Sequence, residues 1–328
     1  MGRDGVDTWA EVVRKLGAGA DPASLDLRRL PDGYLDLRKA KFHRPATVGK
    51  ISVVDRGVAL YRPGKTKLVG VRLQRVDLTG ADIRESIWED FHFEEVRMDR
   101  IKAKDTIFAT GRMERVTFTR ADLRGTHYGQ RSRDSPHMID VDFVDCDLRG
   151  STYSHPQFQR SRFSNANLTR VNFFGSRFEE CVFEGLVDEV IFNGWDSDPD
   201  PKIQALRNPM RNVDFSRAEL KYVAFSRGID ITTCRLPAQG YILIPHPRQT
   251  LQRALEMVER EWSGKQKDNA CAFFRVLLEQ HFPVEQPLYL VRIADFDEYP
   301  LGKETGRNIL EVIRRATQTT ANVGTSAS

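Results

Sequence analysis

The sequence has little of what marks enzymes, metalloproteins and membrane proteins. Its four cysteines lie far apart and none forms a CxxC pair, which argues against a disulfide framework or a cysteine-based metal site. No segment approaches the roughly 18 consecutive apolar residues needed to cross a bilayer. Nucleotide-binding loops, Ser-His-Asp arrangements and paired-carboxylate motifs are also missing. We therefore predict a protein without catalytic residues, cofactor, metal or membrane span.

Net charge is also low. The formal charge of the 328 residues is +4, and the central segment 66–193 has 19 basic and 21 acidic side chains, a net of −2. Such a balance argues against direct binding of nucleic acid and against imitation of it. The first ten residues, Met1 to Ala10, are polar and charged, so we expect a cytoplasmic protein.

What the sequence does have is a period of five. From Leu68 to Phe183 every fifth residue is apolar at 23 of 24 positions, and Arg133 is the exception. At 40% hydrophobic residues, chance would give about ten, so the repeat is a property of the fold. Two residues before each centre stands a smaller residue, as in Val76, Ala121 and Cys146. Neither a helix nor a strand has this period, but a chain that turns a corner at every fifth residue does.

Several of these units resemble those of pentapeptide-repeat proteins. The clearest are Ala121-Asp122-Leu123-Arg124-Gly125 and Ala166-Asn167-Leu168-Thr169-Arg170. The resemblance covers residues 66–193 and, more weakly, 213–238. It implies the fold of that family, a right-handed quadrilateral β-helix in which each coil has four five-residue sides.

A coil of four such sides predicts which side chains lie above one another, about 4.8 Å apart. On this basis Phe118 stacks on Met138 and Leu123 stacks on Phe143, with Phe163 and Phe183 continuing the latter column. The small inward cysteines Cys146, Cys181 and Cys234 are expected to be buried and inert.

Two segments interrupt the repeat. Residues 129–137 place Arg131 and Arg133 at inward positions, where unpaired charge is too costly, so this segment is predicted to bulge outward as a loop. Residues 194–212 are polar at first and contain three prolines, and we predict an inserted loop.

The ends are predicted to differ from the coil. Residues 1–65 form an N-terminal cap, the β-helix spans 66–240, and a small α/β module spans 241–316. Within the module we predict helices at 248–262, 269–281 and 303–316 and a strand at 288–293. The tail 317–328 is predicted to be disordered.

Two groups of residues are candidates for a functional role. The first are apolar residues that the repeat places on the outside of the coil, and the second are residues of the predicted loop 129–137. Ile87 and Ile107 occupy the same position in successive coils and are expected to stack on one outer face. The predicted partner-binding set is Ile87, Ile107, Phe174, Val182, Arg131 and Arg133. An alternative is that a terminal domain folds back over the apolar positions.

These features favour a non-enzymatic binding or scaffold protein whose rigid coil presents a surface to a protein partner. The resemblance offers an alternative, because some pentapeptide-repeat proteins mimic duplex DNA and protect type II topoisomerases; the near-neutral coil disfavours it. A second alternative is an enzyme with its active site in the C-terminal module, using Trp262, His281, Asp295 or Asp297. His127, His137 and His155 are a candidate metal site, but no Cys or carboxylate is spaced to complete it. We therefore predict that these three are ordinary surface histidines.

Overall fold

The computed structural model describes residues 12, 15–16, 18, 20–21, 24–25, 27–42, 66–129, 136–195, 207–300 and 302–324. The chain divides into two compact units, Met1–Asn172 and Phe173–Ser328, and each is described by itself. In the described residues no helix is long and apolar enough to cross a membrane.

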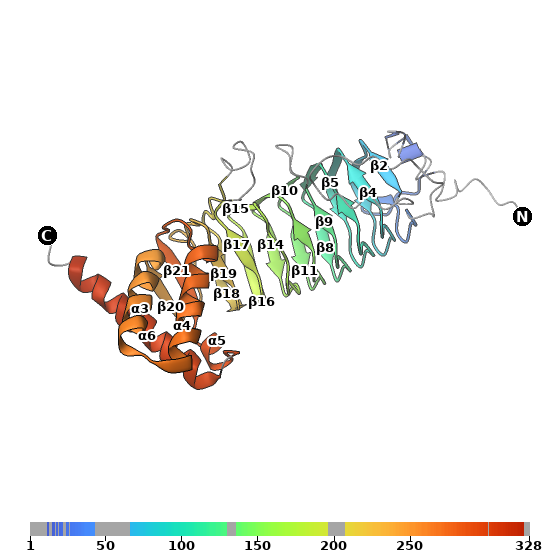
Figure 1. Ribbon diagram of the computed structural model, residues 1–328. Helices are drawn as coiled ribbons and strands as arrows, with labels where there is room; N and C mark the ends of the chain where they lie inside the picture. The colour runs from blue at the N-terminus through green and yellow to red at the C-terminus, as the bar shows by residue number, and fades with distance from the viewer. Residues whose placement is uncertain are drawn as a thin grey trace, which may run out of the picture. The chain divides into compact units, whose positions relative to one another are not determined.

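The first unit is a coil of short parallel strands. Figure 1 shows them side by side, each strand one coil further along than its neighbour. In chain order they are β1 (Leu35–Asp36), β2 (Lys67–Val69), β3 (Arg72–Asp77), β4 (Ile87–Glu89), β5 (Phe91–Arg97), β6 (Ile107–Phe108), β7 (Gly111–Glu114), β8 (Thr117–Thr119), β9 (His127–Tyr128), β10 (His137–Ile139), β11 (Asp142–Val144), β12 (Thr152–Tyr153), β13 (Gln157–Gln159) and β14 (Arg162–Ser164).

Each coil has four sides. One side is the sheet β12-β9-β6-β4-β2, and a second is a row of single bridges that runs from Lys41 to Asn167. In the first coils the other two sides are continuous, because β3 and β5 each extend around the corner between them. In later coils these two sides are separate sheets, β7-β10-β13 and β8-β11-β14. This is the right-handed quadrilateral β-helix that the resemblance to pentapeptide repeats implies.

The centres of the repeat form dry columns along the axis. Phe118 stacks on Phe143 with ring centroids 5.0 Å apart, and Phe143 stacks on Phe163 at 4.9 Å, with the planes within 8° of parallel. Tyr128 and Tyr153 stack at 4.6 Å. All five side chains are almost completely buried. The predicted piling of Phe143 on Phe163 is therefore confirmed.

The predicted stacking across the loop is wrong. Phe118 lies opposite Phe143 rather than Met138, and Met138 lies opposite Met113. The coil that includes the segment 129–137 is thus longer than the others by one five-residue unit, because residues that pair across it are 25 apart in the sequence instead of 20. Columns after the loop are shifted by one side. Leu123 and Leu148 accordingly occupy one side, because their neighbours Asp122 and Asp147 pair.

A buried row of hydroxyl groups lines one side of the core. Ser86, Thr106, Thr126 and Ser151 occupy the small inward positions and are all buried. They donate to main-chain oxygen atoms, for example Thr126 Oγ1 to Leu123 O at 2.8 Å and Thr106 Oγ1 to Ile83 O at 2.7 Å. These bonds offset the cost of removing the hydroxyl groups from water.

The coil begins earlier than predicted. Leu35 pairs with Val76, Lys41 pairs with Asp82, and the buried ring of Phe42 lies 5.6 Å from that of Trp88. Residues 35–42 thus already lie in register with the coil, although the prediction assigned all of 1–65 to a separate cap. The period of five is present here, with Leu37 and Phe42 as centres and Leu35 and Ala40 two residues before them, but it lasts for only two units and is not in phase with the series that starts at Leu68. The predicted strand at 51–58 lies outside the described residues.

The second unit starts with further coil strands. They are β15 (Arg177–Glu179), β16 (Val182–Asp188), β17 (Ile191–Asn193), β18 (Asp214–Lys221) and β19 (Ala224–Ser226). Phe183 stacks on Phe215 at 4.9 Å and Phe192 on Phe225 at 5.5 Å, so the returning pattern is confirmed as coil. Most of the predicted insertion, 196–206, lies outside the described residues.

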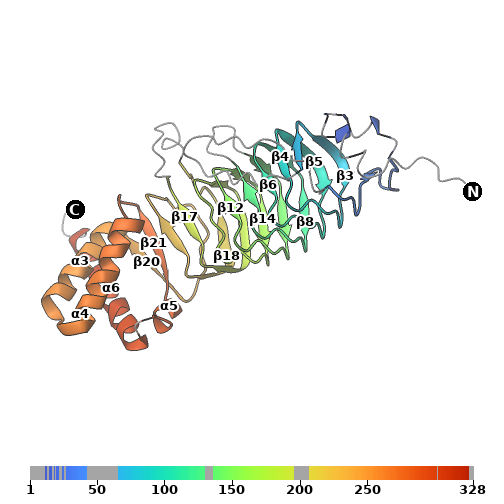
Figure 2. The same ribbon diagram turned by 45° about the vertical axis from the view of Figure 1, so that its right-hand side comes forward.

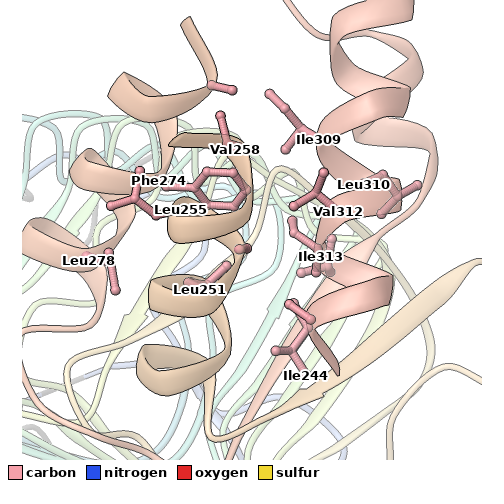
Figure 3. Close-up of a cluster of buried hydrophobic side chains, with 14 of the residues drawn as sticks. Ile244, Leu251, Leu255, Val258, Phe274, Leu278, Ile309, Leu310, Val312 and Ile313 are labelled. Atoms are coloured by element: carbon pink, nitrogen blue, oxygen red, sulfur yellow. The ribbon is translucent and has the colours of Figure 1, made fainter. Parts of the chain in front are cut away.

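The C-terminal part is a small α/β module. It consists of β20 (Tyr241–Pro245), α3 (Pro247–Glu261), α4 (Gly264–Val276), the π-helix η2 (Leu277–His281), β21 (Leu288–Arg292), α5 (Ala294–Asp297) and α6 (Lys303–Gly324). β20 and β21 pair as an antiparallel ribbon, and α3, α4 and α6 lie beside it (Figure 2). Figure 3 shows the core, where Leu251, Leu255 and Val258 of α3 face Ile309 and Ile313 of α6.

The module's helices were predicted in the right order, but two ends were wrong. α4 begins at Gly264 rather than at residue 269. α6 does not end at Ala316 but continues to Gly324, and Thr317 Oγ1 donates to Ile313 O at 2.8 Å. The stretch has no proline, and glycine first appears at Gly324, so an established helix propagates through it at low cost.

Candidate binding surfaces

The predicted partner-binding residues occupy different environments. Ile87 and Ile107 pair in register, as predicted, but Ile87 is only 6% exposed whereas Ile107 is half-buried. Phe174 and Val182 are half-buried in the second unit. Arg131 and Arg133 lie outside the described residues. Of the stacked isoleucine pair, Ile107 is thus the one with surface available for contact.

Among the described residues of the coil, Ile107 belongs to a part of the surface without charged side chains. We call this surface the uncharged face; its half-buried residues are Ile107, His127, Thr152 and Ser154, whereas Ala109 and Gly129 beside them are buried. Its strands are held in register, with Ile107 opposite His127 and His127 opposite Thr152. Main-chain bonds from Gly129 N to Phe108 O and from Ser154 N to Tyr128 O, at 2.8 and 2.7 Å, keep it flat. Burial lowers the pKa of His127 and favours its neutral form.

A different side of the coil is charged but internally paired. Asp82, Asp122 and Asp147 lie in its row of bridges. Each of these carboxylates accepts two hydrogen bonds from the guanidinium of the arginine two positions later in the sequence. For Asp122 and Arg124 both distances are 2.8 Å. The guanidinium of Arg124 holds the pKa of Asp122 below its usual value. The geometry of these ion pairs is bidentate.

One corner of the coil has alternating charges. Its residues lie on successive coils and are Arg75, Glu95, Arg115, Asp140 and Arg160. Glu95 lies between Arg75 at 3.7 Å and Arg115 at 3.5 Å, and Arg160 binds Asp140 with two contacts at 2.8 and 2.9 Å. Because these charges satisfy one another, the corner presents no field of a single sign.

The sequence comparisons agree with this geometry. Residues 142–185 match the model of the family described as pentapeptide repeats, with eight copies. This part of the chain therefore consists of pentapeptide repeats. No curated protein matches it in sequence.

Solved structures of the same repeat type are similar to this chain at low identity. HetL, a pentapeptide-repeat protein involved in heterocyst differentiation regulation from the cyanobacterium Nostoc sp. strain PCC 7120, is 12% identical over 70% of this chain and 97% of its own, with a TM-score of 0.36. QnrB1, a plasmid-mediated fluoroquinolone resistance protein, is 16% identical over 52% of this chain and 79% of its own, with a TM-score of 0.27. Rfr23 from the cyanobacterium Cyanothece 51142 is 14% identical over 46% of this chain and 86% of its own, with a TM-score of 0.23.

Cysteines and histidines of the pentapeptide-repeat coil are packing residues. Cys146 and Cys181 are buried, and burial raises the pKa of Cys146 and of the half-buried Cys234 to about 12, so their thiols stay protonated. His155 was predicted to be a surface residue but is buried. Among the described residues no group of three His, Cys, Asp or Glu side chains is placed to hold a metal ion.

The module places two of the four candidate residues close to the coil strands of the second unit. His281 Nδ1 lies 2.7 Å from Ser226 Oγ, and Asp295 accepts a bond from Tyr222 N at 3.1 Å. Trp262 packs against the module core, and Asp297 pairs with Arg307 at 2.7 Å on the surface. His281 and Asp295 line one cavity of the module, whereas Trp262 and Asp297 do not.

Proposed function

We propose that this protein is a non-enzymatic binding protein that offers the uncharged face of its coil to a protein partner. The observation that supports this most is the continuity of four half-buried, uncharged residues over three coils, on a chain in which 29% of residues are charged. The cores of protein interfaces are depleted of charge. Ile107 provides the apolar contact at one end of this face.

Rigidity supports the same proposal. Backbone bonds between coils fix every strand of the uncharged face, so little conformational entropy is lost when a partner binds. Arg131 and Arg133, which follow Gly129 in the sequence, are proposed to add specific contacts. Phe174 and Val182 are proposed as contacts of the second unit.

The pairing of charges disfavours imitation of DNA. A duplex presents a uniform row of negative charges, whereas the carboxylates of Asp82, Asp122 and Asp147 are each bound by an arginine of the same coil. A partner that recognises DNA by its charge would find no such row on this side.

The uncharged face is tested by Ile107→Asp. A carboxylate at this position has to be desolvated when the partner binds, so we expect binding to weaken by about tenfold or more. The matched control is Thr117→Asp, which places the same charge at the equivalent outward position on another side. Proteins that co-purify with the wild-type chain are identified by mass spectrometry and quantified for both variants.

A partner that is lost with Ile107→Asp and retained with Thr117→Asp is the expected result. Equal retention by both variants, with both folded by circular dichroism, contradicts the proposal.

A further inference from the structure

The C-terminal module contains a cavity that reaches its hydrophobic core. Its volume is 340 Å³, and its floor is formed by the buried core residues Ile244, Leu251 and Ile313. Side chains around an empty space lose the van der Waals contacts that a filled core provides. A space of this size is at the small end of the range for small-molecule sites, which are mostly apolar with a few polar groups.

Aromatic rings dominate the walls of this cavity. They are Tyr222, Phe273, Tyr289, Phe296 and Tyr299. Phe273 meets Phe296 at 6.2 Å and Tyr299 at 5.7 Å between centroids, and both contacts are close to perpendicular. Rings in such an arrangement turn faces as well as edges toward the space between them. The face of an aromatic ring is its electron-rich side and attracts cations.

The cavity lining contains one carboxylate, that of Asp295, and one guanidinium, that of Arg292. Asp295 accepts from Arg292 at 2.9 Å and from Tyr222 N at 3.1 Å. Arg292 also binds Glu219 at 2.5 Å. Glu298 accepts from the hydroxyl of Tyr222 at 2.9 Å and pairs with Lys221 at 3.3 Å. The charge of Arg292 is thus shared between Asp295 and Glu219, and burial raises the pKa of Asp295.

The π-helix η2 completes the wall. Such short helices are uncommon and often occur at functional sites. η2 places Leu277 and His281 in the cavity lining. Burial lowers the pKa of His281, so the imidazole is neutral and does not repel a cation.

We propose that this cavity binds a small organic cation, an ammonium group with apolar substituents, whose charge lies against the aromatic rings and Asp295. The aromatic walls and the carboxylate of Asp295 attract the charge, and the apolar floor accommodates the substituents. This binding site is distinct from the uncharged face of the coil and does not depend on it.

The test compares two probes of the same shape on the full chain. One is meta-hydroxyphenyltrimethylammonium and the other is its uncharged isostere, meta-tert-butylphenol. By isothermal titration calorimetry the cation is expected to bind about tenfold more tightly. Equal or tighter binding of the phenol would show a purely apolar site, and binding of neither probe at millimolar concentration would show no site; both results overturn the proposal.

A pair of variants tests the role of the rings. Tyr222 is 39% exposed, so its replacement is compatible with folding. Tyr222→Phe retains the ring and is expected to keep the affinity for the cation within about twofold, whereas Tyr222→Leu lowers it about fivefold or more and leaves the affinity for the phenol unchanged. An equal loss in both variants, or no loss in Tyr222→Leu, contradicts the aromatic basis of binding.

Discussion

Replacing Phe143 with alanine is expected to lower the free energy of unfolding by about 3–5 kcal/mol, because it opens a cavity between two stacked rings. Phe143 is fully buried and lies 5.0 Å from Phe118 and 4.9 Å from Phe163. Neighbouring coils are fixed by backbone bonds on all four sides and cannot close the space. The measurement is urea denaturation followed by circular dichroism.

The matched control for Phe143→Ala is Val144→Ala on the same strand. Val144 points outward and is half-buried, so its truncation is expected to cost at most about 1 kcal/mol. Phe143→Leu, which fills most of the space, is expected to fall between the two. If Phe143→Ala cost no more than Val144→Ala, the column of rings would not be the main source of the coil's stability.

The second large effect is expected at Gly111. A Cβ atom here would lie 2.7 Å from the ring of Phe91 and closer still to its carbonyl oxygen, and the φ angle of Gly111 is +143°. Phe91 fills an inward position that is small elsewhere, and the glycine one coil later makes room for it. Gly111→Ala is therefore expected to cost about 3 kcal/mol through overpacking and backbone strain.

Gly150→Ala separates the two causes. Gly150 has a φ of +67°, but no atom lies within 4 Å of the position that a Cβ would take, so only the left-handed backbone opposes substitution. We expect a cost of about 1 kcal/mol. Both variants are compared by the midpoint of urea denaturation. Equal costs would mean that the close approach of Phe91 contributes nothing.

The architecture of the coil was predictable because its signal is repeated. Twenty-three apolar centres in one phase leave no other fold with the same spacing, and the buried Phe118, Phe143 and Phe163 confirm it. The shift of columns after Gly129 was not predictable from spacing, since five additional residues in one coil leave the phase of five unchanged. Only pairing between coils, such as Met113 with Met138, reveals it.

The candidate sites were predictable in part. Outward apolar residues follow from the repeat, so Ile107 was found, but the burial of Ile87 depends on what surrounds the coil and not on the repeat. His281 and Asp295 were named from the sequence as isolated residues. Their cavity unites residues from Tyr222 to Ile313, contributed by strands, helices and a π-helix, and no local pattern connects them.

The register across the loop tests the central claim most directly, and it can be measured with pairs of cysteines. Thr117 and Asp142 lie opposite each other on β8 and β11, with both side chains outward. Residues paired in this way on adjacent strands are within reach of a disulfide bond. We expect Thr117→Cys with Asp142→Cys to cross-link under mild oxidation. Thr117→Cys with His137→Cys, which would be neighbours if the loop added no extra unit to the coil, is expected to remain reduced. The opposite result would contradict the lengthened coil and the columns built on it.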